Sequence, residues 1–286
     1  MKQMNNIFVA GATGYLGKYI TKELSAQGYY TKVLVRNPEK FNRFQIQVDG
    51  IIQAEVTNKS TLQDCCKNID TVISSVGITK QKDGLSYMDV DYQANLNLLD
   101  EAKRSGVKKF IYVSLLNGEK LRSLKICKAK EKFVEELKNS GLDYCIIRPN
   151  GFFSDMTEFY DMAKSGRVYL FGSGDQKANA IHGEDLAKVC VSALESDDKE
   201  IEVGGPETLT HTDIAKLAFE VVGKTPKIVH IQDWMRRSIL KIAKLFMSAK
   251  KFGPIEFFMN VMAIDMIAPE YGQHTLKNYF DELRLR

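Results

Sequence analysis

The sequence predicts an α/β fold in which helices cover both faces of a parallel sheet, followed by a smaller mixed α/β lobe. Short apolar strands alternate with amphipathic stretches long enough to cross back over a sheet, which forces the strands to run parallel. The first strand also leads directly into the glycine triplet Gly11, Gly14 and Gly17 and then into a helical pattern. With 286 residues, 44% of them hydrophobic, the chain can bury a sizeable core.

The strands of the predicted sheet are short and rich in apolar residues. We expect them at Asn6–Ala10, Thr31–Val35, Gly50–Ala54, Asp70–Val76, Lys109–Ser114 and Asp143–Arg148. The clearest helices between them are Gly14–Gln27, Ser60–Lys67, Ser86–Ser105 and Leu124–Ser140. The last two end just before Gly106 and Gly141, where a left-handed cap is typical. These elements predict a doubly wound Rossmann domain over residues 1–150.

Residues 151–286 predict a substrate and lid lobe that is interleaved with the core and ends in helices. The expected elements are a helix at Asp155–Ser165, a strand at Val168–Phe171, a helix at Gly183–Glu195, a strand at Ile201–Val203 and a helix capped by Thr210. Ligands of open α/β sheets lie outside the carboxyl ends of the strands. Topology therefore places this lobe where it can close over a bound cofactor.

The glycine triplet indicates a dinucleotide site. Gly11 lets the chain turn off the strand, Gly14 lets the backbone approach a pyrophosphate, and Gly17 lets the helix lie close to the sheet. The helix directs its free N–H groups and the positive end of its dipole at the phosphates. A tight turn without a ligand is the alternative, but the strand before it and the second strand after it favour the cofactor. The other predicted contacts in this turn are Thr13, Tyr15 and Leu16.

Arg36 favours NADP(H) over NAD(H). It ends the second strand, where NAD sites usually carry an acid on the ribose 2′-hydroxyl, and its guanidinium can pair with a 2′-phosphate. Such a charge-assisted bond is worth roughly 1.5–3 kcal/mol, or about 10- to 150-fold in preference. Lys40 can add to it, and the alternative is a solvated arginine in a polar loop.

The other candidate residues lie at the ends of later strands. Glu55 and Val56 follow the third strand, where an adenine ring would rest, and Ser75 and Val76 follow the fourth, beside the ribose and nicotinamide. Ordinary turn chemistry is the alternative for this serine-rich end. Two further candidates close the fifth and sixth strands, namely Ser114 and Pro149.

Lys130 is the catalytic candidate, together with Ser114. It lies on the helix Leu124–Ser140, whose apolar residues indicate one face packed on the sheet. A lysine beside the nicotinamide ribose can hold its hydroxyls and supply positive charge near a hydride acceptor. Periodicity alone does not separate Lys130 from the other lysines of this helix, Lys125, Lys128, Lys132 and Lys138.

Three segments carry a resemblance to a known family. They are Gly11–Gly17, the segment Lys128-Ala129-Lys130 followed by Ser140–Tyr144, and Ile147–Phe153. With these motifs the chain resembles the atypical short-chain dehydrogenase/reductases, over most of its length. Within them it is similar to the branch of the divinyl chlorophyllide 8-vinyl reductases and, more distantly, to NmrA-like and isoflavone-reductase-like proteins. Phe171–Asp175 and Tyr271–Leu276 are also similar to that branch.

The resemblance implies a reductase with an unusual active site. Most members of the wider family use a Tyr-x-x-x-Lys pair, but Ile126 occupies the position four residues before Lys130. This departure argues against epimerases and ordinary alcohol dehydrogenases and fits reduction of a conjugated double bond by NADPH. The returning proton would come from water, Tyr160 or His182. A dinucleotide-binding redox sensor without turnover, or a scaffold for a membrane redox complex, is the alternative.

Composition limits the other function classes. A net charge of +4 is too small and dispersed for a nucleic-acid binder. Five cysteines without C-x-x-C spacing, and four scattered histidines, predict neither a disulfide framework nor a metal site. The start of the chain leaves no room for a signal peptide, and no apolar run reaches the ~20 residues of a membrane span. We therefore expect a cytoplasmic protein.

The segment 234–267 adds a possible peripheral membrane contact. Trp234–Phe252 carries apolar residues at helical spacing and the cations Arg236, Arg237, Lys241, Lys244, Lys250 and Lys251 without an acid. Such a helix can lie on an anionic membrane. The alternative is packing onto the parent domain as a Met-rich lid over a bulky substrate. Together with Phe152, Phe153, Phe159 and Met162, this content favours a large, conjugated, mostly apolar substrate.

Overall fold

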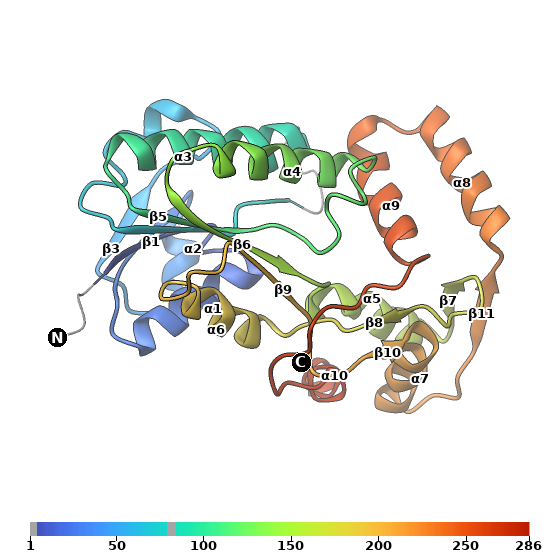
Figure 1. Ribbon diagram of the computed structural model, residues 1–286. Helices are drawn as coiled ribbons and strands as arrows, with labels where there is room; N and C mark the ends of the chain where they lie inside the picture. The colour runs from blue at the N-terminus through green and yellow to red at the C-terminus, as the bar shows by residue number, and fades with distance from the viewer. Residues whose placement is uncertain (1–4, 79–83, 286) are drawn as a thin grey trace. The chain divides into compact units, whose positions relative to one another are not determined.

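The computed structural model describes residues 5–78 and 84–285, and the chain divides into two compact units. The first unit comprises residues 1–148 and 186–201, and the second comprises 149–185 and 202–286. A seven-stranded sheet has the order β3-β2-β1-β4-β5-β6-β9. Helices α3 and α4 cover one face of this sheet, and α1 and α6 cover the other (Figure 1). The predicted doubly wound parallel sheet is confirmed.

The sheet strands agree with the predicted ones to within two residues at each end. Their bounds are β1 Asn6–Ala10, β2 Tyr30–Val35, β3 Gly50–Gln53, β4 Thr71–Ser74, β5 Lys109–Val113, β6 Asp143–Pro149 and β9 Glu200–Val203. β1 pairs in parallel with both β2 and β4, so that Ile7 lies opposite Thr31 on one side and Thr71 on the other. The strand order reverses at this point, and the carboxyl ends of β1 and β4 therefore open into the crevice where ligands of such folds bind.

The helices of the first unit are α1 Tyr15–Ala26, α2 Pro38–Asn42, α3 Asn95–Arg104, α4 Lys125–Lys138 and α6 Gly183–Ser192, the last of which begins in the second unit. The predicted helix Ser60–Lys67 is wrong, because only a short 3₁₀ helix, η1 Lys59–Leu62, forms there. Asp64 and Asn68 have positive φ angles of 60° and 61°, and a right-handed helix cannot pass through such residues.

The predicted helix Ser86–Ser105 is two helices of different kinds. Its first part is a π-helix, η2 Met88–Ala94, and its second part is α3. The wider π-turn carries Asp91 into the interior, where this side chain is fully buried. Such turns are rare and frequently occur at functional sites.

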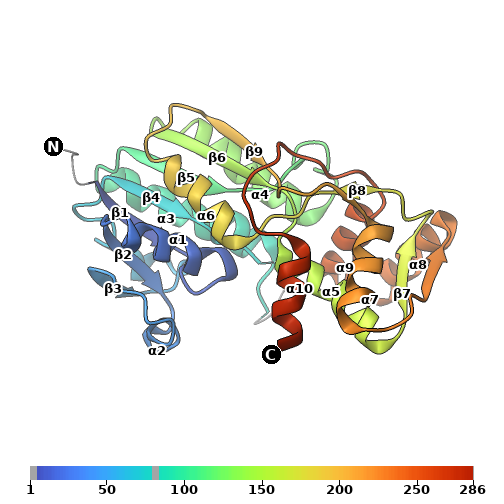
Figure 2. The ribbon, with the colours of Figure 1, turned by 90° about the horizontal axis from the view of Figure 1, so that it is seen from below.

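The second unit is built on a helical cluster with two small sheets. Its helices are α5 Phe153–Ser165, α7 His211–Val222, α8 Asp233–Phe246, α9 Ala249–Val261 and α10 Leu276–Leu285. The strands β7 Val168–Phe171 and β11 Ile228–Ile231 pair in parallel, and β8 Lys177–Ala178 and β10 Leu209–Thr210 pair antiparallel. Figure 2 shows α10 beside α5 and α7, and a core that includes Phe159, Phe219 and Phe280 joins these three helices.

Two details of the second unit test the sequence analysis. Thr210 caps α7 as predicted, because its hydroxyl accepts from the Asp213 amide at 3.0 Å and donates to the Asp213 carboxylate at 2.6 Å. The basic segment Trp234–Phe252 is instead two helices, because Met247 adopts an extended backbone with ψ of 143° between α8 and α9.

In the part of the chain that the structure describes, no helix is both long and apolar enough to cross a membrane. All five cysteines are buried and free. The cytoplasmic location stays a prediction.

Candidate functional site

The turn between β1 and α1 brings bare backbone to the crevice between β1 and β4. Gly11 has a φ of +88°, and a Cβ on it would lie 2.7 Å from the Ser75 hydroxyl oxygen. A Cβ on Gly17 would lie 2.1 Å from the Gly11 carbonyl oxygen, so a side chain there would push the helix off the turn. The Gly14 amide donates to that same carbonyl at 2.9 Å. These contacts give the spacing of the glycines a steric reason.

The first turn of α1 is open to a ligand. Gly14, at its N-cap, is exposed, and no side chain caps the helix within the described residues. Tyr15 begins the helix, and its ring meets that of Tyr19 edge to face at 5.5 Å. Leu16 is 4% exposed, so its predicted contact to a cofactor would have to come from its backbone. The amides of this turn and the helix dipole suit a pyrophosphate, so the residues present fit a dinucleotide.

Arg36 and Glu55 lie side by side beyond the ends of β2 and β3. The Arg36 Nε lies 3.8 Å from a Glu55 carboxylate oxygen, and the Arg36 side chain is 65% exposed. Asn37 caps the short helix α2 by accepting from the Lys40 amide at 3.2 Å. The guanidinium therefore stands at the surface, where an incoming phosphate can compete with a loosely paired carboxylate.

The end of β4 is held by a buried amide. Asn95 at the start of α3 accepts from the Ser74 hydroxyl at 2.6 Å and donates to the Val76 carbonyl at 3.2 Å. The Ser75 hydroxyl donates to the Ala10 carbonyl at the end of β1, at 3.2 Å. Two residues further along α3, the Asn97 side chain donates to the Val56 carbonyl beyond the end of β3 at 3.1 Å. Ser75, Val76 and Val56 are thus part of one rigid edge.

Lys130 is the buried lysine of α4. It is 8% exposed, whereas the other lysines that the sequence could not separate from it are exposed: Lys125, Lys128, Lys132 and Lys138. Its Nζ lies 3.1 Å from an oxygen of Asp91 in η2 and 3.4 Å from both the Tyr112 hydroxyl and the Val113 carbonyl of β5. Burial opposes the charge, but Tyr112 and Asp91 prevail and raise the pKa of Lys130. The ammonium is therefore charged at neutral pH.

The loop after β4 connects Lys130 to the glycine turn. A Cβ on Gly77 would lie 2.7 Å from the Asp91 carboxylate and 3.0 Å from the Lys130 Nζ, whereas Ser75 two residues earlier meets Gly11. Asp91 also accepts from the Ile78 amide at 3.3 Å. One short loop therefore lies against both the phosphate cradle and the charged lysine.

Ser114 is held in a second buried cluster. Its hydroxyl donates to Glu131 at 3.3 Å, and Glu131 forms a bidentate pair with Arg148 at 2.6 and 3.1 Å. Glu131 is fully buried, and Arg148 also donates to Glu200 at 2.7 Å. The pair fixes the ends of β5 and β6. Pro149, the last residue of β6, begins the second unit.

The second unit contains a histidine cluster that sequence spacing does not reveal. The His182 and His274 rings stack at 4.3 Å, and His274 lies 3.3 Å from Glu184 and 2.9 Å from Asp185. Donor atoms of His182, Glu184 and His274 lie within 4.8 Å of one another. The Glu184 amide donates to His182 Nδ1 at 3.3 Å, and burial, followed by His274, lowers the pKa of His182. These contacts hold the 272–274 loop against the start of α6, which gives the cluster a structural role.

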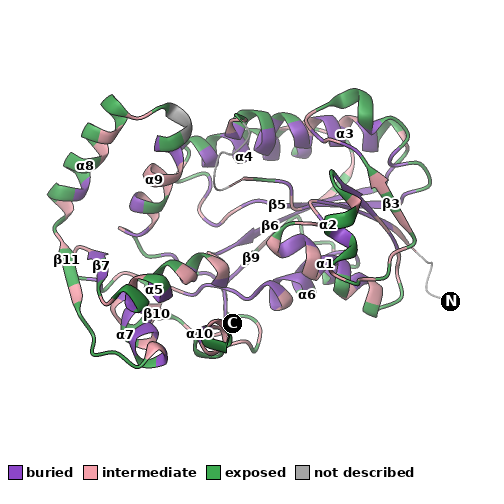
Figure 3. Ribbon diagram, turned by 180° about the vertical axis from the view of Figure 1, so that it is seen from behind, coloured by how far each residue is buried: buried purple, intermediate pink, exposed green. Residues whose placement is uncertain are grey.

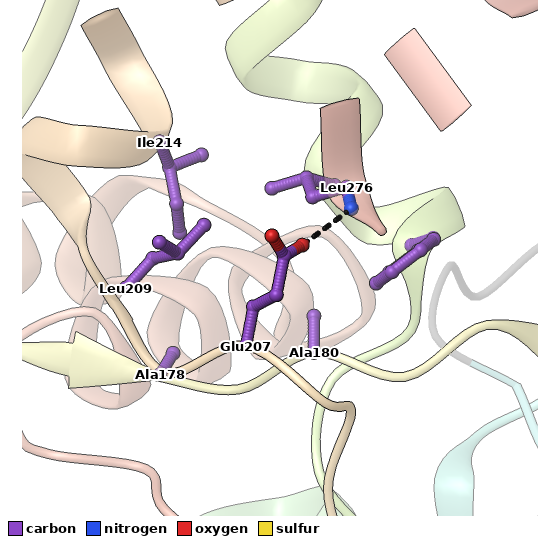
Figure 4. A pocket seen from close by; sticks show the side chains of 7 residues that line it. Ala178, Ala180, Glu207, Leu209, Ile214 and Leu276 are labelled. Atoms are coloured by element: carbon purple, nitrogen blue, oxygen red, sulfur yellow. Dashed lines mark hydrogen bonds between the residues drawn. The ribbon is translucent and has the colours of Figure 1, made fainter. Parts of the chain in front are cut away.

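A small cavity near this cluster lies inside the second unit. It measures about 10 Å³, and Figure 4 shows Ala178, Ala180, Leu209, Ile214 and Leu276 around Glu207. Glu207 accepts from the Leu276 amide at 2.9 Å and so caps α10. A space of this size holds at most about one water molecule, so it is no substrate site.

Sequence analysis missed Asp91 and Tyr112. Asp91 lies in a stretch that reads as an ordinary helix, and only the π-turn brings it inward. Tyr112 stands in the apolar strand KFIYV, where a hydroxyl within an otherwise apolar run was the available signal. Burial raises the pKa of Tyr112 to about 12, so its hydroxyl stays protonated. A tyrosine thus contacts Lys130 although Ile126 occupies the usual position.

The comparisons with known proteins agree with this geometry. A family model described as NAD(P)H-binding matches residues 11–197. The divinyl chlorophyllide a 8-vinyl-reductase of Arabidopsis thaliana is 27% identical over 318 residues, covering 96% of this chain and 76% of that protein. The photosystem II assembly factor Ycf39 of Synechocystis is 26% identical over 294 residues, covering 96% and 90%. The structure of the NADPH-dependent quinone oxidoreductase QOR2 of Escherichia coli has a TM-score of 0.74 at 17% identity, covering 97% and 99%, which shows a shared fold.

Proposed function

The chain belongs to the NAD(P)H-binding family, and from this premise we propose that it is an NADPH-dependent reductase of a conjugated or carbonyl-containing, mostly apolar small molecule. The observation that carries the proposal is a buried, charged lysine in the same unit as the glycine turn. Lys130 and the turn contact the same 75–77 loop. A cation at this point can serve turnover as well as binding, because it can stabilise the negative charge that develops on a hydride acceptor.

In the proposed reaction the protein positions and stabilises, and the bound cofactor supplies the hydride. The glycine turn and the α1 amides hold the pyrophosphate. Lys130 binds the ribose hydroxyls and places positive charge where the hydride acceptor becomes negative. Asp91 and Tyr112 hold the ammonium in place. Because the Tyr112 hydroxyl is fully buried, the proton that completes the reduction comes from water rather than from Tyr112.

We propose NADPH rather than NADH because of Arg36. Its side chain is 65% exposed beyond the end of β2, and a guanidinium can pair with a 2′-phosphate in two-point geometry. Lys40 is exposed in the next helix and adds positive charge to this edge. The NAD(P)H-binding family includes proteins that use either nicotinamide cofactor, so the preference rests on these two cations.

The substrate class rests on the relatives rather than on the aromatic residues. Phe153 and Phe159, whose apolar character favoured an apolar substrate, are 2% and 1% exposed and pack in the core of the second unit. Their apolar character is accounted for by folding. A relative named as a divinyl chlorophyllide a 8-vinyl-reductase supports a conjugated, apolar acceptor. The named assembly factor supports the second candidate, in which the bound cofactor serves a scaffold without turnover.

Turnover separates the two candidates. Purified protein is mixed with NADPH and a panel of quinones, enones and conjugated pigments, and oxidation of NADPH is followed by absorbance. We compare wild type with Lys130→Met, which removes the charge at similar length, and with Lys128→Met on the exposed side of α4. Burial raises the pKa of the Asp91 carboxyl, so in Lys130→Met it can become neutral.

We expect Lys130→Met to lower turnover roughly 100-fold with a smaller change in the Kd for NADPH by calorimetry, and Lys128→Met to match wild type. Tight binding of NADPH without turnover of any acceptor would support the scaffold or a redox sensor. Full turnover in Lys130→Met would remove the lysine from the mechanism.

A further inference from the structure

Helix α8 of the second unit exposes an apolar face. Trp234, Met235, Ile239, Ile242, Leu245 and Phe246 form this face, which we call the α8 face. Leu245 and Phe246 are 80% and 84% exposed. Figure 3 shows most of α8 in green, as exposed, with pink and purple bands between. Apolar positions at this spacing normally face the core of the unit that contains the helix, so this face lacks the partner that its sequence predicts.

One side of α8 is held against its unit. Arg236 is the only residue of α8 that is buried, and it donates to the Asn260 side chain at 3.1 Å and to the Met259 carbonyl at 3.4 Å, both in α9. The remaining turns of the 14-residue helix extend beyond this contact over about 15 Å. The structure therefore fixes the direction of α8 while leaving its apolar face accessible.

The exposed charge on α8 is predominantly positive. Asp233 is the only acid of the helix, and it pairs with Arg236 at 2.7 Å and with Arg237 at 2.6 Å. Lys241 and Lys244 are exposed on the side of the helix opposite Ile239 and Ile242 and form no ion pair within the described residues. The side chain of Lys250, counted with this segment in the sequence analysis, lies outside the described residues.

We propose that α8 lies on the surface of a membrane with anionic headgroups. The α8 face enters the boundary between headgroups and acyl chains, and Arg237, Lys241 and Lys244 meet the lipid phosphates. The single tryptophan of the chain stands at the start of this face, and indole rings favour the membrane interface.

Charge selects this occupant over a second copy of the chain. A symmetric pairing of two α8 faces would cover the apolar residues but supply no counter-charge to Lys241 and Lys244, because Asp233, the one acid of the helix, is already engaged. An anionic surface covers the apolar residues and supplies that counter-charge at the same time.

Trp234 provides a direct measurement. The full chain is titrated with vesicles of phosphatidylcholine alone and of phosphatidylcholine mixed equally with phosphatidylglycerol. We expect a blue shift of the tryptophan emission and co-sedimentation with the mixed vesicles, and neither with the neutral ones. Brominated acyl chains in the mixed vesicles should quench Trp234, because the face is inserted rather than held at a distance.

Two variants separate the apolar and the charged contributions. Lys241→Gln/Lys244→Gln should weaken binding to the mixed vesicles roughly 10- to 30-fold, since each basic residue near an anionic surface strengthens binding by about three- to fivefold. Ile242→Ser/Phe246→Ser, which leaves every charge in place, should abolish the quenching. Lys67→Gln/Lys103→Gln removes two exposed lysines from the first unit and should bind as wild type does.

Three results would overturn the proposal. The first is equal binding to neutral and anionic vesicles. The second is self-association of the wild type in analytical ultracentrifugation that Ile242→Ser/Phe246→Ser abolishes, because the α8 face then pairs with a second copy. The third is a blue shift on adding NADPH without lipid, because α8 then covers the cofactor as a lid.

Discussion

Lys130 and Asp91 form a buried pair that could not be predicted from the sequence. Five lysines lie on α4, and only the structure separates the one that faces the interior. Asp91, its partner, is fully buried and comes from a different helix 39 positions away in the printed sequence. The family resemblance, and not the spacing, singled out Lys130, and neither of them contains a signal for the anion that keeps it charged.

We predict that Asp91→Asn is strongly destabilising. The substitution leaves the Lys130 ammonium buried without an anion, so its pKa falls and the free energy of unfolding decreases by roughly 3 kcal/mol. Chemical denaturation followed by circular dichroism measures the change. Asp100→Asn is the matched control, because it breaks an exposed pair with Lys59 at 2.6 Å, where we expect a loss below about 1 kcal/mol. Equal losses in the two variants would show that burial of the Asp91 pair carries no special weight.

Elements were predicted best where the hydrophobic pattern is long and the ends are marked. β1 has the predicted bounds, and Gly106, directly after the C-cap Ser105 of α3, adopts the left-handed φ angle of 76°. Gly141 also has a left-handed φ of 82°, but α4 already ends at Lys138. The 60–67 region failed because Asp64 and Asn68 adopt left-handed conformations that periodicity does not reveal. The π-turn of η2 also keeps an apolar pattern that reads as α-helix, so the sequence places the element but not its hydrogen bonding.

The turn between β1 and α1 leads to a prediction at the scale of the element. In Gly17→Ala the new Cβ would lie 2.1 Å from the Gly11 carbonyl oxygen, so α1 must move away from the turn. We expect the Kd for NADPH to rise at least roughly tenfold, because the amides of the first turn no longer meet the pyrophosphate, and the melting temperature to fall.

The stability control for this variant is Gly151→Ala, whose Cβ meets only the Met156 Cε at 3.8 Å. Its melting temperature should stay near that of the wild type. If the two variants have the same melting temperature and Gly17→Ala binds NADPH with the Kd of the wild type, the close approach at Gly17 is not required for cofactor binding.

At the scale of the whole molecule, the parallel sheet and the family follow from the sequence, whereas the residues that return to the first unit do not. The match to a family model confirms that the chain belongs to the NAD(P)H-binding family. Residues 186–201 belong to the first unit, because β9 pairs beside β6 at the edge of the sheet and α6 covers one face of it. A linear reading of the sequence could not place this return, since pairing of β9 with β6 depends on contacts between segments far apart in the chain. The small strands β8, β10 and β11 escaped prediction because they have only two to four residues.

Cofactor binding should act on the stability of the first unit as a whole. At a free NADPH concentration about 100 times its Kd, mass action raises the free energy of any local opening that must release the cofactor by roughly 2.7 kcal/mol. Hydrogen exchange measured by mass spectrometry reads the two units separately. We expect slower exchange in β1, β4 and α4, which surround the proposed site, and unchanged exchange in α8.

In Arg36→Asp the same protection should require NADH instead of NADPH, because the carboxylate repels the 2′-phosphate and accepts from the 2′-hydroxyl. An Arg36→Asp protein that still prefers NADPH would show that this arginine does not select the cofactor.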